Sequence, residues 1–307
     1  MNEWVLAGLN GTNPLAFLAA IGTLRVSTLA FPDRTPRMRW AIWEGAWRPW
    51  LSIEATVDVE TWLEGIDRVL REETGHIAFG IADNLNLPIE AFRKVGRDAM
   101  ELARPNDRRY ADFLAAFGSD AVESVVNGKR SGMMADTALR TMSGAGHQHF
   151  LGFMRTLAKD NEIKDIRSAL LGRWTYSDPG PSMRWDPNDD RRYALRWLEP
   201  SGDPIRTVRG ANRLAIEGIP LLPTMPVKGR LETTGFTQEK RRQAVWSWPI
   251  WKQQIGLKVL SSLISLPELQ KDNPDRNALM AMGIAEVYRC DRITEGKYRN
   301  FTIAHPV

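Results

Sequence analysis

The chain has 307 residues, of which 43% are hydrophobic and 25% charged, and these proportions are ordinary for a globular protein. Its length allows one large domain or two smaller ones, each with a sizeable core. The single cysteine, Cys290, excludes an intramolecular disulfide and a thiolate zinc cluster, which fits a reducing cytoplasm. The N-terminus lacks a basic segment and the apolar run at 14–21 is too short to span a bilayer, so we expect a cytoplasmic protein without a membrane anchor.

Charge is distributed unevenly along the chain. Residues 1–150 carry 16 Lys and Arg against 19 Asp and Glu, whereas residues 151–307 carry 25 against 18. A basic half indicates a polyanionic partner, and an acidic half indicates a protein partner. We therefore distinguish an acidic N-terminal region at 1–140, with a buried helix and a Trp-rich hairpin, from a basic C-terminal region at 141–307. The two regions either fold separately or form one continuous domain.

Helical and strand patterns alternate through the acidic region. Asn13 is placed to cap a helix that Pro14 opens, and apolar side chains nearly surround this helix, so it should be buried. Two alternating stretches flank Glu44 and Gly45 and predict a hairpin. The expected elements are a strand at 3–9, the helix at 14–25, hairpin strands at 38–43 and 46–53, helices at 57–73, 88–102 and 107–117, and loose loops at 118–146.

The basic region also mixes both kinds of element. A glycine-rich approach at 144–152 leads into a helix that reaches Lys159, and Pro220 stops a later helix. The other expected elements are helices at 165–171, 206–218 and 257–266, strands at 192–197, 227–234 and 244–250, and a closing hairpin of 285–293 with 298–303. The predicted fold class is α+β, with helical segments packed against short antiparallel strands and hairpins. Most of the 12 tryptophans should lie in the core.

Residues 184–213 combine seven arginines with five carboxylates and two tryptophans. Residues 192–197 alternate apolar side chains with arginines, which predicts a strand with one guanidinium-bearing face. Arg206, Arg209 and Arg213 are spaced i, i+3 and i+7, so on a helix they share one face. Such a row suits phosphate, because guanidinium is always charged and binds oxyanions bidentately. The alternative is that these arginines pair with nearby carboxylates in surface networks that have no other role.

Candidate catalytic groups are few. His147 and His149 need further ligands to hold a metal, and we favour a pair at a helix start that bonds to backbone or to phosphate. Asp186, Asp189 and Asp190 offer oxygen ligands for Mg²⁺, but no nuclease pattern follows them, and turn formation is the preferred interpretation. The sequence has no nucleophile elbow, no Walker-type phosphate loop and no dinucleotide fingerprint. We therefore expect no catalytic site, no metal and no cofactor.

Several segments together resemble CRISPR-associated proteins of type I-G systems, formerly called I-U. Residues 13–25, which read Asn-Pro-Leu-Ala-Phe-Leu-Ala-Ala-Ile-Gly-Thr-Leu-Arg, are similar to the opening motif of that group. Residues 146–151, 184–197, 209–220 and 288–301 are also similar to it. The resemblance implies a large-subunit-like component of a Cascade surveillance complex. Such a subunit holds the end of the DNA that carries the protospacer-adjacent motif, helps to separate the strands, and docks a nuclease-helicase without being a nuclease itself.

In such a complex guide pairing reads the sequence, while protein contacts the backbone and a short motif. The partners implied are the other Cascade subunits, guide RNA, target double-stranded DNA and the nuclease-helicase, without a membrane. Asn212 or Gln148 would contact a base edge, and the basic side chains would contact phosphates. The residues assigned to nucleic-acid binding are Arg184, Arg191, Arg192, Arg196, Arg206, Arg209, Asn212, Arg213, Lys228, Arg230, Lys240, Arg241, Arg242, His147, Gln148 and His149.

Two other functional classes stay open on the sequence. A metal-dependent nuclease would require His147, His149 and Asp186 to converge on a metal. A purely structural subunit would bind its partners through the acidic N-terminal region and would show no salt-dependent binding of DNA.

Overall fold

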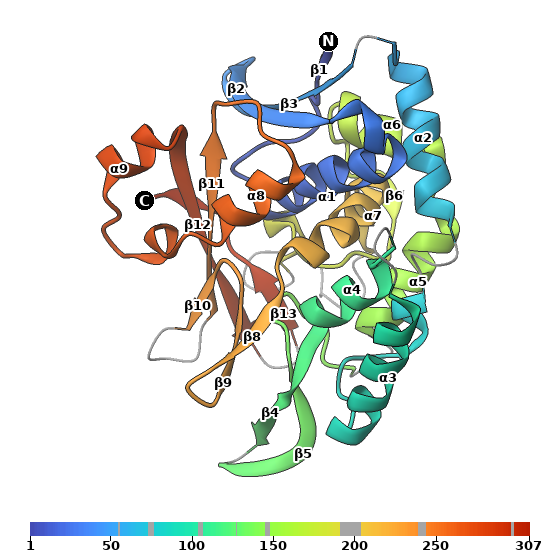
Figure 1. Ribbon diagram of the computed structural model, residues 1–307, viewed down its shortest axis with the longest axis vertical. Helices are drawn as coiled ribbons and strands as arrows, with labels where there is room; N and C mark the ends of the chain where they lie inside the picture. The colour runs from blue at the N-terminus through green and yellow to red at the C-terminus, as the bar shows by residue number, and fades with distance from the viewer. Residues whose placement is uncertain are drawn as a thin grey trace.

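The computed structural model describes residues 1–54, 56–72, 77–103, 107–126, 128–144, 148–190, 204–238, 244–295 and 298–307. The expected α+β class is confirmed, with helices packed beside small antiparallel sheets (Figure 1). The helices are α1 (Pro14–Ala30), α2 (Val59–Arg71), α3 (Ile89–Leu102), α4 (Arg109–Phe117), α5 (Phe150–Asp160), α6 (Ile163–Leu171), α7 (Arg209–Gly218), α8 (Leu257–Ile264) and α9 (Arg276–Ala281). The strands are β1 (Asn2–Val5), β2 (Arg37–Trp43), β3 (Ala46–Ile53), β4 (Gly118–Val126), β5 (Lys129–Asp136), β6 (Asp178–Pro179), β7 (Arg206–Thr207), β8 (Thr224–Val227), β9 (Arg230–Thr233), β10 (Phe236–Gln238), β11 (Ala244–Trp251), β12 (Ile284–Glu295), β13 (Tyr298–Phe301) and β14 (His305–Pro306).

Helices α1 and α7 lie against each other at the centre of the molecule (Figure 1). Two glycines allow their backbones to touch. A Cβ atom added at Gly22 would lie 1.9 Å from the carbonyl oxygen of Leu214, and one added at Gly218 would lie 2.5 Å from the carbonyl oxygen of Leu18. Since both neighbouring atoms are backbone, a larger residue at either position would have to separate the helices.

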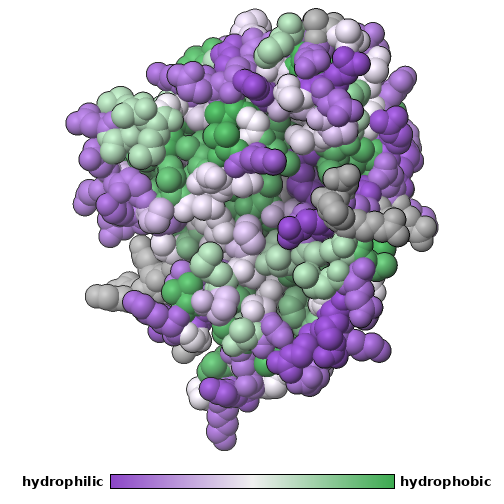
Figure 2. Space-filling model, viewed as in Figure 1, coloured by the Kyte–Doolittle hydropathy of each residue, from purple (hydrophilic) through white to green (hydrophobic). Residues whose placement is uncertain are grey.

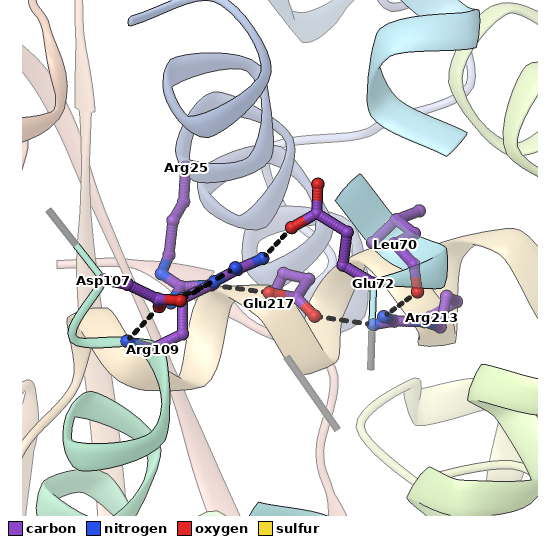
Figure 3. Close-up of polar contacts among 7 residues, drawn as sticks. All are labelled: Arg25, Leu70, Glu72, Asp107, Arg109, Arg213 and Glu217. Atoms are coloured by element: carbon purple, nitrogen blue, oxygen red, sulfur yellow. Dashed lines mark hydrogen bonds and ion pairs between the residues drawn. The ribbon is translucent and has the colours of Figure 1, made fainter. Parts of the chain in front are cut away.

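A buried ion network joins these two helices to α2 (Figure 3). Glu217 of α7 accepts hydrogen bonds from Arg25 of α1 and from Nη1 of Arg213, the latter at 2.8 Å. Nη2 of Arg213 also donates to the carbonyl oxygen of Leu70, at the end of α2, at 3.1 Å. All three charged side chains are at most 5% exposed. Buried charges are tolerated only when they are compensated, and the carboxylate of Glu217 lies between the two guanidinium groups and bonds to both.

The sheets place an aromatic core against α1. The C-terminal sheet has the order β10-β11-β12-β13, with β14 also paired to β12, and the N-terminal sheet has the order β1-β3-β2. Strand β11 is buried along its whole length. The ring of Phe17 in α1 lies between 5.6 and 6.5 Å, centroid to centroid, from the rings of Trp40, Trp246, Trp248 and Trp251. These four indoles are at most 1% exposed, as expected for core, whereas Trp43 of the N-terminal tryptophan cluster is 42% exposed.

Several local predictions are confirmed. Asn13 caps α1 by accepting a hydrogen bond from the backbone nitrogen of Ala16 at 3.2 Å. Glu44 and Gly45 have φ angles of 48° and 75° and connect β2 to β3, the geometry of a type I′ hairpin turn. Capping and turn chemistry depend on neighbouring residues only, which is why the sequence predicts them well.

Other local predictions are wrong. Residues 118–146 are not all loops, because β4 and β5 pair into an antiparallel hairpin through their backbones, which requires no regular apolar pattern. The single strand expected at 227–234 is instead the β8–β9 hairpin. The first strand ends at Val5 and not at residue 9. The strand expected at 192–197 lies outside the described residues.

One hydrophobic core cluster runs from Leu6 to Phe301 and includes residues on both sides of position 140. Hydrophilic residues dominate the outer edge of α2 and the tip of the β4–β5 hairpin, whereas hydrophobic residues reach the surface around α8 and α9 (Figure 2). The exposed apolar side chains there are Val259, Met280 and Met282. Within the described ranges, no helix is both long enough and apolar enough to cross a membrane.

Gly22→Ala should destabilise the protein, because the added methyl group overlaps the carbonyl oxygen of Leu214 and forces α1 away from α7. Overpacking typically costs about 1–3 kcal/mol, and a contact with rigid backbone belongs at the upper end. Gly96→Ala in α3 is the matched control, since nothing lies within 4 Å of its added Cβ. The control should be neutral or should stabilise by up to about 1 kcal/mol. Urea and thermal unfolding measure both variants, and equal stabilities would contradict the close contact.

Glu217→Gln should also destabilise the protein, because it removes the negative charge that compensates both Arg25 and Arg213. Breaking a buried ion pair by changing one partner costs about 3–5 kcal/mol. Glu72→Gln is the matched control: Glu72 pairs with Arg109 at 2.6 Å in the same region but is 43% exposed (Figure 3). Its loss should cost no more than about 1 kcal/mol. Equal losses in chemical unfolding would show that burial of the network contributes nothing.

Candidate nucleic-acid interface

The regularly spaced arginines do not share the face of one helix, so this expectation is wrong. Arg206 is exposed in β7, and α7 begins only at Arg209. Nη1 of Arg209 lies 3.6 Å from a carboxylate oxygen of Asp165. Arg213 is 1% exposed and belongs to the buried ion network. Spacing fixes where side chains lie relative to one another on a helix, but packing decides which face is buried.

Asn212 and Arg184 are buried too, which corrects their assignment to an exposed interface. Asn212 is 0% exposed, and its carboxamide accepts a hydrogen bond from the backbone nitrogen of Met183 and donates one to Thr207 Oγ1, both at 2.9 Å. Arg184 is 3% exposed, and its Nη2 donates to Oε1 of Gln148 at 2.8 Å. These polar groups connect segments inside the protein, so they offer little surface to a ligand.

The remaining assigned residues lie at the surface or outside the described residues. Lys228 and Arg230 are exposed on the β8–β9 hairpin, and His149 is half-buried just before α5. Arg206 donates from Nη1 to the carbonyl oxygen of Ser177 at 3.0 Å. A role for these residues in nucleic-acid binding stays a prediction. The assigned residues that the structure does not describe are His147, Arg191, Arg192, Arg196, Lys240, Arg241 and Arg242.

A groove of about 750 Å³ lies between the N-terminal loop, the β2–β3 hairpin and the segment that follows α6. Its walls carry amide, hydroxyl, basic and aromatic side chains from parts of the chain that are far apart in sequence. The polar and aromatic lining includes Asn10, Thr12, Arg48, Arg173, Trp174 and Tyr176.

Asn10 and Asp186 fix the loops on either side of the groove. Oδ1 of Asn10 accepts hydrogen bonds from the backbone nitrogen and the hydroxyl of Thr12, both at 3.1 Å, which closes a tight turn. Asp186 is 2% exposed and accepts hydrogen bonds from the backbone nitrogen of Asn188 at 2.9 Å and from the hydroxyl of Tyr176 at 3.0 Å. Burial raises the pKa of Asp186, and the hydrogen bonds that its carboxylate accepts oppose this shift. The turn-forming interpretation of Asp186 is confirmed.

Trp174 and Tyr176 form an aromatic wall. Their ring centroids are 6.1 Å apart and their planes meet at 85°. Nε1 of Trp174 donates to the carbonyl oxygen of Ala169 at 2.9 Å, and the hydroxyl of Tyr176 donates to Asp186. A hydrogen bond to the protein therefore fixes each ring. Tyr176 has a φ of 51°, a conformation rare for a bulky residue, and strain of this kind persists only where surrounding contacts enforce it. Burial, followed by the nearby Asp186, raises the pKa of Tyr176, so its hydroxyl stays protonated and acts as a donor.

Arg48 and Arg173 form the basic wall. Arg173 is 93% exposed, and its Nη2 lies 3.8 Å from a carboxylate oxygen of Glu44. Nε of Arg48 is buried without a hydrogen-bond partner, and no ion pair of Arg48 occurs within the described ranges. Burial lowers the pKa of Arg48, Glu44 opposes this shift, and Arg173 adds to it. A second anion in the groove would compensate this partly buried charge.

The groove thus combines guanidinium groups, which bind oxyanions, with aromatic rings, on which planar groups stack. The sequence-based assignment missed Arg48, Arg173, Trp174 and Tyr176. The sequence contained one signal for this site: a basic residue is followed closely by two aromatic ones in the run Arg173-Trp174-Thr175-Tyr176. Arg48 gave no signal of its own, because only the fold brings its strand to this segment.

Metal-binding groups do not gather in the part of the chain that the structure describes, where no three His, Cys, Asp or Glu side chains form a suitable cluster. The structure does not describe His147, so it does not test whether His147, His149 and Asp186 converge on a metal. Cys290 is 0% exposed, and burial raises the pKa of its thiol. A neutral buried thiol is a poor nucleophile.

No protein-family model matches the chain, and no curated protein sequence matches it either. The likeness to CRISPR-associated proteins of type I-G systems therefore rests on the sequence segments themselves. Two of these segments, 13–25 and 184–197, both reach the groove, which Asn13 and Pro187 help to line.

Proposed function

We propose that the protein is a non-catalytic subunit of a type I CRISPR Cascade-like surveillance complex. In this role it binds the backbone of target DNA and guide RNA, helps to recognise the protospacer-adjacent motif, and helps to recruit the nuclease-helicase. The groove is the observation that carries the proposal, because it combines phosphate-binding and base-stacking side chains beside two segments of the family resemblance. The other Cascade subunits are the protein partners, and the cytoplasm is the compartment.

The size of the groove favours a single strand over a duplex. Sites of about 300–1,000 Å³ bury ligands of roughly nucleotide to dinucleotide size, and the groove has about 750 Å³. Arg48 and Arg173 would contact phosphates on one side. Trp174 and Tyr176 would present the edge or face of an aromatic ring to a base on the other side, where stacking contributes about 1–3 kcal/mol per base. A strand displaced from target DNA meets these requirements.

Arg206 extends the same surface. Its guanidinium binds the carbonyl oxygen of Ser177, the residue directly after Tyr176, and its side chain is exposed. Contacts of this kind are made to the backbone and do not distinguish bases. Most sequence discrimination in such a complex comes from guide pairing, so a groove whose basic side chains would contact chiefly the backbone agrees with the role proposed.

Replacing Arg48 and Arg173 together by Ala should weaken binding of labelled single-stranded DNA and flatten its salt dependence. Each phosphate contact on a single strand contributes about 0.7 to the slope of log K against log salt, so the slope should fall by about 1.4. Fluorescence anisotropy over a series of salt concentrations measures both quantities. Circular dichroism checks that the variant is folded.

Arg68→Ala with Arg97→Ala is the matched control, because both arginines are exposed and neither makes an ion pair within the described ranges. The control removes the same charge from α2 and α3 and should leave the slope within about 0.3 of the original. If the two double variants show equal salt slopes, Arg48 and Arg173 do not contact the DNA and the groove is not the binding site. Metal-dependent cleavage of the DNA would favour a nuclease, and wild-type protein without salt-dependent binding would favour a purely structural subunit.

A further inference from the structure

A second, smaller cavity lies among residues of β9, β10, β11, β12, β13 and the end of β5. Its volume is about 150 Å³, well above the roughly 10–15 Å³ that one water molecule needs. It is separate from the groove, and the two share no lining residue. Its charged lining consists of Arg292, Arg299, Asp136 and Glu232.

Strand register brings the two arginines together. Arg292 of β12 lies opposite Phe301, and Thr294 of the same strand lies opposite Arg299 of β13. Side chains two residues apart on a strand, and side chains directly opposite on a neighbouring strand, point to the same face of a sheet. Arg292 and Arg299 therefore project from one face into the same cavity, next to Phe236.

The described part of the protein provides hydrogen-bond acceptors for only some of the N–H donors of these guanidinium groups. Nη1 of Arg292 donates to the carbonyl oxygen of Ala138 at 2.7 Å, but its Nε is buried and has no partner. Arg299 makes no hydrogen bond and no ion pair within the ranges that the structure describes. The carboxylate of Asp136 is already bonded to Arg140, and Glu232 is exposed without an ion pair among the described residues.

Electrostatics indicate that positive charge is in excess here. Burial, followed by the charge of the neighbouring Arg299, lowers the pKa of Arg292 to about 10, and Asp136 opposes this shift. Burial also lowers the pKa of Arg299, with Arg140 adding to the shift and Asp136 opposing it. Burial raises the pKa of Asp136 itself. Within the described ranges, Asp136 is the carboxylate that interacts with the guanidinium groups of Arg140, Arg292 and Arg299, and its side chain is only 21% exposed. A bound anion would stabilise this arrangement.

We propose that this cavity binds one oxyanion of the phosphate class, held by Arg292 and Arg299. Guanidinium forks match phosphate oxygens bidentately, and the unpartnered Nε of Arg292 gains an acceptor. The cavity is smaller than the roughly 300 Å³ at which sites for organic ligands begin, so it accommodates a phosphoryl group but not an attached nucleoside. The ligand is therefore free inorganic phosphate or the terminal phosphate of a polynucleotide. The proposal does not rest on the groove or on the function proposed for it.

The test compares thermal unfolding in sodium phosphate and in sodium chloride of matched ionic strength, on the full chain. Phosphate should raise the melting temperature of the wild-type protein above its value in chloride, because a ligand that binds only the folded state stabilises it. Arg299→Gln should lose at least half of this phosphate-specific shift. It should be at least as stable as wild type in chloride, because Arg299 has no bonding partner among the described residues to lose. The repulsion of Arg299 by Arg140 and Arg292 also outweighs its attraction to Asp136.

Arg97→Gln on the exposed side of α3 is the control and should keep the full phosphate shift. Isothermal titration with inorganic phosphate gives a second readout, in which Arg299→Gln should weaken binding at least tenfold. A wild-type protein that responds equally to phosphate and chloride would overturn the proposal, and so would an unchanged phosphate affinity in Arg299→Gln.

Oligonucleotides with and without a terminal phosphate distinguish the two sources of the ligand. They are added to an Arg48→Ala, Arg173→Ala background, so that groove binding does not contribute. If only the end-phosphorylated strand displaces inorganic phosphate, the cavity takes a polynucleotide end. If neither strand displaces it while inorganic phosphate still binds, the ligand is free phosphate.

Discussion

Helices α1 and α7 touch through their backbones at Gly22 and Gly218, and the rest of the structure is arranged around this contact. The close approach brings Arg25 of α1 within hydrogen-bonding distance of Glu217 on α7, and Glu217 in turn holds Arg213. Arg213 of the arginine-rich region thereby becomes part of the core. The charges of α7 serve to join helices, and an ion network of this kind fixes how the helices are oriented as much as how stable they are.

The groove that we propose as the binding site lies at the rim of this core. The loop that caps α1 and the segment that follows α6 form a groove with the β2–β3 hairpin. Loops held by a rigid framework commonly carry binding residues, because their side chains are not packed in the core while their backbones are held in place. The buried Asp186 illustrates this division, since it makes no contact with solvent but holds Tyr176 in the wall of the groove.

Features that depend on neighbouring residues could be predicted from the sequence. The Asn13 cap and the Glu44-Gly45 turn follow from local chemistry, and the structure confirms them. The burial of tryptophans in β11 follows from their apolar surface area, but Trp43 is 42% exposed. The exposure of individual arginines could not be predicted, because periodicity does not say which helix face packs inward. The groove and the smaller cavity could not be predicted for a different reason. Their lining residues come together only after strands and helices that are distant in sequence have assembled, as Arg48 and Arg173 do in the groove and Asp136 and Arg299 do in the cavity.

We propose that the groove beside the α1 cap holds a strand of nucleic acid. Bromouracil-substituted single-stranded DNA can be cross-linked photochemically to the purified protein, and the cross-linked peptides can then be mapped. Cross-links are expected at Trp174 or Tyr176 and within the peptide that carries Arg48. Cross-links confined to other surfaces, such as the hairpin of Lys228 and Arg230, with none in the groove, would contradict this proposal.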